Sequence, residues 1–65
     1  MSSPSTVVNE LLDAHKKLDE ACDIIRRAMD YADDDTRREL ERIRKKIIDI
    51  KLQIDYVIDR YIRWW

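Results

Sequence analysis

Three side chains that could bind a metal ion lie close together in the first half of this 65-residue chain. His15, Asp19 and Cys22 form the pattern H-x3-D-x2-C, which places three possible zinc ligands near one face of a helix. The spacing matches neither a zinc finger nor the HExxH motif, and a small cysteine also fills space in an apolar seam. We therefore expect no metal here, and we expect His15 to hydrogen-bond to Asp19, Gln53 or another copy of the chain.

Two charged runs could bind ions or nucleic acid. Residues 33–35 are three aspartates, but the sequence lacks the glycine and the ligand spacing of a calcium-binding EF-hand loop. Six cations lie within residues 37–46, but Glu39 and Glu41 interrupt them and no aromatic residue is interleaved to stack on bases. The chain has 13 basic and 14 acidic residues and a net charge of −1, so we expect no nucleic-acid partner.

The C-terminal residues 61–65 combine aromatic and cationic side chains, as interfacial membrane anchors do. No apolar stretch approaches the roughly 20 residues that cross a bilayer, and residues 1–6 lack the charged and apolar regions of a signal peptide. We expect Tyr61 and Trp64 to pack against Val8 and Leu11. We further expect no membrane partner, no targeting signal, and a soluble protein that is cytoplasmic or synthetic.

Catalytic machinery is not indicated by the sequence. It contains no glycine-rich loop and no Ser/His/Asp or Cys/His arrangement, so we expect no catalytic residues, no cofactor and no enzymatic activity. The single cysteine cannot form a disulfide within the chain. A chain this short can build only a small hydrophobic core of its own. This indicates that association with other chains completes the fold.

Apolar residues repeat at spacings of three and four on both sides of the acidic run, a pattern typical of amphipathic helices. This pattern predicts an all-α, antiparallel two-helix hairpin that forms one domain over residues 1–65. The helices are predicted over residues 4–32 and 36–65, with a turn at residues 33–35, and the hairpin is expected to assemble into a multi-helix bundle or barrel. The net charges of the two helices, −2 and +4, favour their pairing.

The helix starts carry capping signals. Ser3 followed by Pro4 is typical of a first helical turn. Thr36 with Glu39 three residues later predicts a capping box at the start of the second helix.

The predicted seam within the hairpin follows the same repeat, and all its members except His15 are apolar or aromatic. It consists of Val8, Leu11, His15, Leu18, Cys22, Ile25, Met29, Leu40, Ile43, Ile47, Ile50, Ile54, Val57, Tyr61 and Trp64.

A second set of apolar residues lies beside the seam and predicts an oligomer interface. Its members are Val7, Ala14, Ala21, Ile24, Ala28, Tyr31, Ile48, Ile58, Ile62 and Trp65. If Val8 and Leu40 both occupy heptad position a, the two helices present these stripes on opposite faces of the hairpin. Contacts between unlike faces close as rings, so we expect a homo-oligomeric ring of about four to eight copies in preference to a dimer.

The chain resembles de novo designed helical-hairpin oligomers. The resemblance rests on the uninterrupted heptads, the isoleucine-rich residues 40–57, the absence of glycine, the DDDT turn and the segment RRELERIRKK. It implies a synthetic, self-assembling scaffold, some examples of which enclose a central channel. An alternative is a binding module similar to the Rop family of dimeric hairpins, which contact RNA through a helix face; only length and architecture support it.

Overall fold

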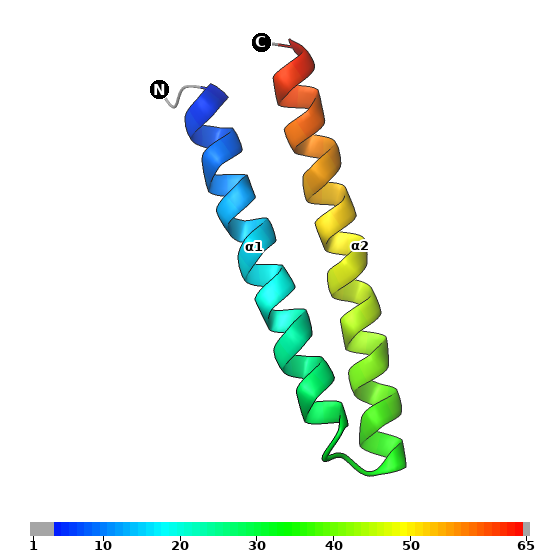
Figure 1. The fold of residues 1–65 in the computed structure, drawn as a ribbon. Coiled ribbons are helices and arrows are strands. Elements are labelled where there is room, and N and C mark those ends of the chain that lie inside the picture. Colours follow the sequence, from blue (N-terminus) through cyan, green and yellow to red (C-terminus); the bar gives the residue numbers. More distant parts are fainter. Residues whose placement is uncertain (1–3, 65) are drawn as a thin grey trace.

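The computed structural model describes residues 4–64, and the side chains of residues 5–63, as two long helices joined by a short turn (Figure 1). Helix α1 spans Pro4–Met29 and helix α2 spans Asp34–Trp64. The helices lie antiparallel and form a rod of 47 × 15 × 14 Å (Figure 1). No strand occurs in the described part of the chain. The predicted all-α antiparallel hairpin is confirmed.

The helix bounds differ from the predicted ones at both sides of the turn. Helix α1 ends three residues before the predicted residue 32, and α2 begins two residues before the predicted residue 36. Pro4 opens α1, where its missing N–H costs no hydrogen bond. The predicted cap Ser3 and the predicted last helical residue Trp65 lie outside the described residues.

Asp33, and not Thr36, caps the start of α2. The backbone N–H of Thr36 donates to Asp33 Oδ1 at 2.8 Å. Hydrogen bonds from the Thr36 side chain and backbone lower the pKa of the Asp33 carboxyl. Asp34 and Asp35 then occupy the first turn, where the helix dipole favours negative charge. The predicted capping box is therefore wrong: Thr36 is the donor, and the Glu39 side chain pairs with Arg42 at 3.2 Å.

The end of α1 is held by a side chain from α2. No described residue has a positive φ, so the left-handed cap that glycine usually provides is absent from residues 4–64. The Arg37 guanidinium instead donates from Nε to the Met29 carbonyl and from Nη2 to the Ala32 carbonyl, both at 3.1 Å. It also contacts Asp34 at 3.3 Å. From the first turn of α2, Arg37 thereby satisfies the last carbonyl of α1 and one carbonyl of the turn.

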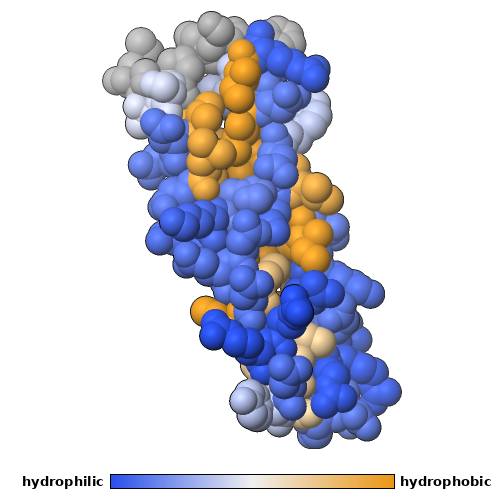
Figure 2. Space-filling model, in the orientation of Figure 1, coloured by the Kyte–Doolittle hydropathy of each residue, from blue (hydrophilic) through white to orange (hydrophobic). Residues whose placement is uncertain are grey.

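The hairpin has almost no interior. Among residues 5–63, Ile58 is the one buried side chain, with 8% of its surface exposed. The chain exposes 5422 Å², whereas a compact protein of its 7.9 kDa mass exposes about 4,400 Å². Hydrophobic residues form a strip near the chain ends and a further patch at one side halfway along the rod, while hydrophilic residues cover most of this view toward the turn (Figure 2).

Candidate functional site: two faces of the hairpin

Helix α2 presents a different set of residues to α1 than the apolar pattern predicts. In the structure, a series of α2 residues at alternating spacings of four and three is partly or fully shielded from solvent: Leu40, Arg44, Ile47, Lys51, Ile54, Ile58 and Tyr61. The predicted series shared four of these residues but contained Ile43, Ile50 and Val57 in place of Arg44, Lys51 and Ile58. Ile43 and Ile50 are instead 40% and 46% exposed, Val57 is half-buried, and the Trp64 side chain lies outside the described ones.

The α1 members of the predicted seam are half-buried. They are Val8, Leu11, His15, Leu18, Cys22, Ile25 and Met29.

Two cations belong to the shielded side of α2. The Lys51 side chain is only 21% exposed, and its ammonium group contacts the Asp19 carboxylate on α1. Arg44 is half-buried and binds Glu41 on its own helix at 2.7 Å. The aliphatic stems of lysine and arginine cover apolar surface while their charged ends reach solvent or a partner. Counting apolar residues alone cannot detect this contribution.

A polar cluster crosses the seam near its middle. His15 Nδ1 lies 3.5 Å from Asp19 Oδ2, and His15 Nε2 lies 3.2 Å from Asp55 Oδ1 on α2. The hydrogen bond from Lys51 lowers the pKa of Asp19, with a smaller contribution from His15, and the same bond raises the pKa of Lys51. The sequence suggested Asp19 as a partner of His15, whereas Asp55 was missed.

Metal-ligand geometry is not found at this cluster. Both ring nitrogens of His15 already face carboxylates, and Cys22 is a free, half-buried thiol. Within residues 4–64, no group of three His, Cys, Asp or Glu side chains is arranged to hold a metal ion.

Local carboxylates pair with most cations of the 37–46 cluster. Arg37 contacts Asp34 and Arg38 contacts Asp35, while Arg42 and Arg44 contact the glutamates three residues before them. The hydrogen bonds from Arg44 lower the pKa of Glu41. Four of the six cations are thus partly neutralised.

Neither helix, over its described residues, is long and apolar enough to cross a membrane.

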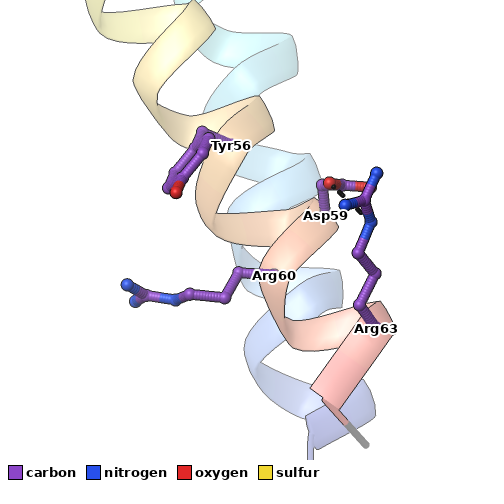
Figure 3. Close-up of a pocket in the computed structure, with 4 residues that line it drawn as sticks. All are labelled: Tyr56, Asp59, Arg60 and Arg63. Atoms are coloured by element: carbon purple, nitrogen blue, oxygen red, sulfur yellow. Dashed lines mark ion pairs between the residues drawn. The ribbon is translucent and has the colours of Figure 1, made fainter.

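Shallow hollows lie along the sides of the hairpin. One, of about 140 Å³, is lined by Tyr56, Asp59, Arg60 and Arg63 of α2. In Figure 3, Asp59 and Arg63 pair at 3.1 Å on one side of the helix, while Tyr56 and Arg60 extend from the other side. The second hollow, of about 380 Å³, is lined only by charged residues: Asp23, Arg26 and Arg27 of α1, and Asp30 of the turn. Neither combines an apolar wall with converging polar groups, as ligand sites do.

The cross-helix contacts fix which residues share a level along the rod. Residue 15 contacts residue 55 and residue 19 contacts residue 51, so residues at one level have numbers that add to about 70. Three levels then pair a small residue of α1 with a branched residue of α2: Ala28 with Ile43, Ala21 with Ile50, and Ala14 with Val57. With Arg44, Lys51 and Ile58 at position a, all six residues occupy g positions, which lie on the same side of an antiparallel pair.

We call these six residues, Ala14, Ala21, Ala28, Ile43, Ile50 and Val57, the alanine–isoleucine face. The e positions of both helices form the opposite side, which we call the charged face because four of its seven residues are Asp, Glu or Arg. The charged face consists of Leu12, Asp19, Arg26, Glu41, Ile48, Asp55 and Ile62.

The residues of the predicted oligomer interface are spread over several environments. Ile58 is buried, Val7, Ala14, Ala21 and Ile48 are half-buried, and Ile24, Ala28, Tyr31 and Ile62 are exposed. Ile58 belongs to the shielded series of α2, whereas Ile48 lies on the charged face. Trp65 lies outside the described residues.

Comparisons of the chain with known protein families, with curated proteins and with solved structures find no match.

Proposed function

We propose that this chain is a structural building block, which folds by associating with copies of itself into a homo-oligomeric helical bundle. The observation that carries the proposal is the lack of an interior: Ile58 alone is buried among residues 5–63, while Ile43 and Ile50 remain 40% and 46% exposed. Two isolated helices bury one stripe each, and most helix stability in proteins comes from packing of apolar faces.

The exposed area supports the same proposal. The hairpin exposes about 1,000 Å² more than a compact chain of its mass. If a little over half of that area is apolar, its burial contributes about 15 kcal/mol at 25 cal/mol/Å². This gross contribution matches the upper end of the net stability of typical domains, about 5–15 kcal/mol. Association is therefore large enough to decide whether the hairpin folds.

A role in binding nucleic acid is less well supported. The carboxylates paired with Arg37, Arg38, Arg42 and Arg44 would have to be displaced or would repel phosphates. We expect negligible RNA or DNA binding at physiological salt in a fluorescence-anisotropy titration. Submicromolar binding with a steep salt dependence, weakened in an Arg42→Gln/Lys45→Gln variant, would favour the Rop-like alternative.

The solution mass tests the proposed function. Light scattering coupled to size-exclusion chromatography is expected to give a multiple of the 7.9 kDa chain mass. The predicted ring of about four to eight copies, and any channel within it, stays a prediction that the same measurement tests. A folded species with the mass of one chain at every concentration would overturn the proposal.

A further inference from the structure

We propose that the second copy binds at the alanine–isoleucine face, forming a two-fold symmetric four-helix dimer with both turns at the same end. This inference rests on the proposed self-association and specifies its surface, copy number and orientation.

The composition of the two faces selects the surface. Every level of the alanine–isoleucine face is apolar, and Ile43 and Ile50 expose 40% and 46% of their surface there. The charged face carries the cluster of Asp19, Asp55, His15 and Lys51 near its middle. Covering that face would remove ionised carboxylates from water, which is costly unless each gains a new partner.

The exposed area is large enough for one standard interface per chain. A standard interface buries about 800 Å² on each partner, which is close to the roughly 1,000 Å² by which this chain exceeds a compact monomer. A ring needs two such surfaces per chain. The ring expected from the sequence joins Ala14 and Ala21 of one copy to Ile48 and Ile62 of the next. In the structure Ile48 and Ile62 lie on the charged face, where Asp55 stands between them.

The sizes of the side chains select the orientation. A two-fold axis parallel to the helices places α1 of one copy over α2 of the other, so that Ala21 meets the partner's Ile50 at the same level. A two-fold axis across the helices would place alanine over alanine and isoleucine over isoleucine, leaving gaps at one pair of helices and crowding at the other. Protein interiors pack densely, and both gaps and crowding destabilise them.

Charge favours the same orientation. Helix α1 carries five acidic and four basic residues, and α2 carries seven acidic and nine basic residues. Stacking α1 on the partner's α2 therefore brings opposite net charges together. At one edge of the proposed interface, Glu10 and Arg60 share a level. In the dimer, Glu10 of each copy therefore lies opposite Arg60 of the second copy. The crossed arrangement would bring like-charged helices together, which is unfavourable at close range.

Charge insertions on and off the proposed surface test it. Sedimentation equilibrium is expected to give twice the 7.9 kDa chain mass for the wild type. Ile50→Asp is expected to raise the dimer dissociation constant at least about 100-fold, because a carboxylate would be desolvated in each half of the interface. Leu52→Asp is the matched control: Leu52 is 61% exposed and lies off the face, so its change is expected to stay below about threefold.

A second pair of variants separates a dimer from a ring. Ala21→Lys should dissociate the assembly, whereas Ile62→Lys, on the charged face, should leave it intact. If either variant fails to fold, the wild-type mass still decides the copy number. Loss of assembly in Ile62→Lys, or a wild-type mass of three or more chains, would overturn the dimer but leave self-association standing. A single-chain mass would overturn both proposals.

A distance between spin labels tests the orientation. Asp30→Cys in a Cys22→Ser background places one label near the turn of each copy. With both turns at the same end and helix axes 8–10 Å apart, the labels should lie within about 30 Å of each other in double electron–electron resonance. A distribution approaching the 47 Å length of the hairpin would overturn the same-end arrangement.

Discussion

Replacing Arg37 with glutamine is expected to destabilise the hairpin although Arg37 lies on its surface. Arg37 donates to the Met29 and Ala32 carbonyls at 3.1 Å each, across the turn. Each bond contributes about 0.5 to 1 kcal/mol in a half-exposed setting, and a cation beside the negative end of α1 adds a few tenths. The contact with the exposed Asp34 adds little. The loss should therefore be about 1–2 kcal/mol.

Urea unfolding followed by circular dichroism, at one fixed protein concentration, measures this loss. Arg38→Gln is the matched control, because Arg38 is more exposed and contacts only Asp35 in its own turn; its effect should stay within about 0.5 kcal/mol. Arg37→Lys retains the charge but not the two-pronged geometry, so it should recover less than half of the loss. Equal losses in the Arg37→Gln and Arg38→Gln variants would refute the proposed capping role.

Three further results are expected. Ile58→Ala should lower the free energy of unfolding by about 2–5 kcal/mol in the same assay, whereas Ile62→Ala, at 65% exposure, should lower it by less than about 0.5 kcal/mol. Similar losses would contradict the burial of Ile58 between the helices. The pKa of Asp19 is held below its usual 3.8, so the stability that its pairing confers is present above pH 3.8 and is lost as pH falls through the lower folded pKa. The pKa of Lys51 is raised, so the stability from Lys51 is lost only as pH rises through a value above 10.5. Asp19→Asn should flatten both limbs of the stability–pH curve, and an unchanged curve would contradict the pairing. Equimolar Zn²⁺ should leave the unfolding midpoint unchanged; a rise abolished by Cys22→Ala would reveal a metal site.

The helices and their antiparallel order could be predicted from the sequence because periodicity is a local property. Apolar spacings of three and four persist through both halves, and the acidic run interrupts them once. The cap was harder to predict because Asp33 and Thr36 both carry side-chain oxygens suited to it. The hydrogen bond from the Thr36 N–H to Asp33, which depends on the path of the turn, decides between them.

The rotation of α2 could not be predicted from apolar spacing. Ile43 and Ile50 fit the repeat as well as their neighbours do, but in the structure they are 40% and 46% exposed, while Lys51 is shielded and contacts Asp19 on α1. That contact depends on which residues share a level, and therefore on the length and path of the turn. The same uncertainty concealed Asp55 as a partner of His15. A sequence search for acid–base pairs whose numbers add to a constant would have suggested the contact.

The concentration dependence of thermal unfolding tests most directly whether folding requires association. For a dimer of 65-residue chains, a hundredfold increase in concentration adds about 2.7 kcal/mol to the stability of the folded state, which corresponds to a rise of about 10 °C in the midpoint. The proposed coupling of folding and association predicts this rise. A cooperative transition whose midpoint stays constant over the same hundredfold range would contradict it.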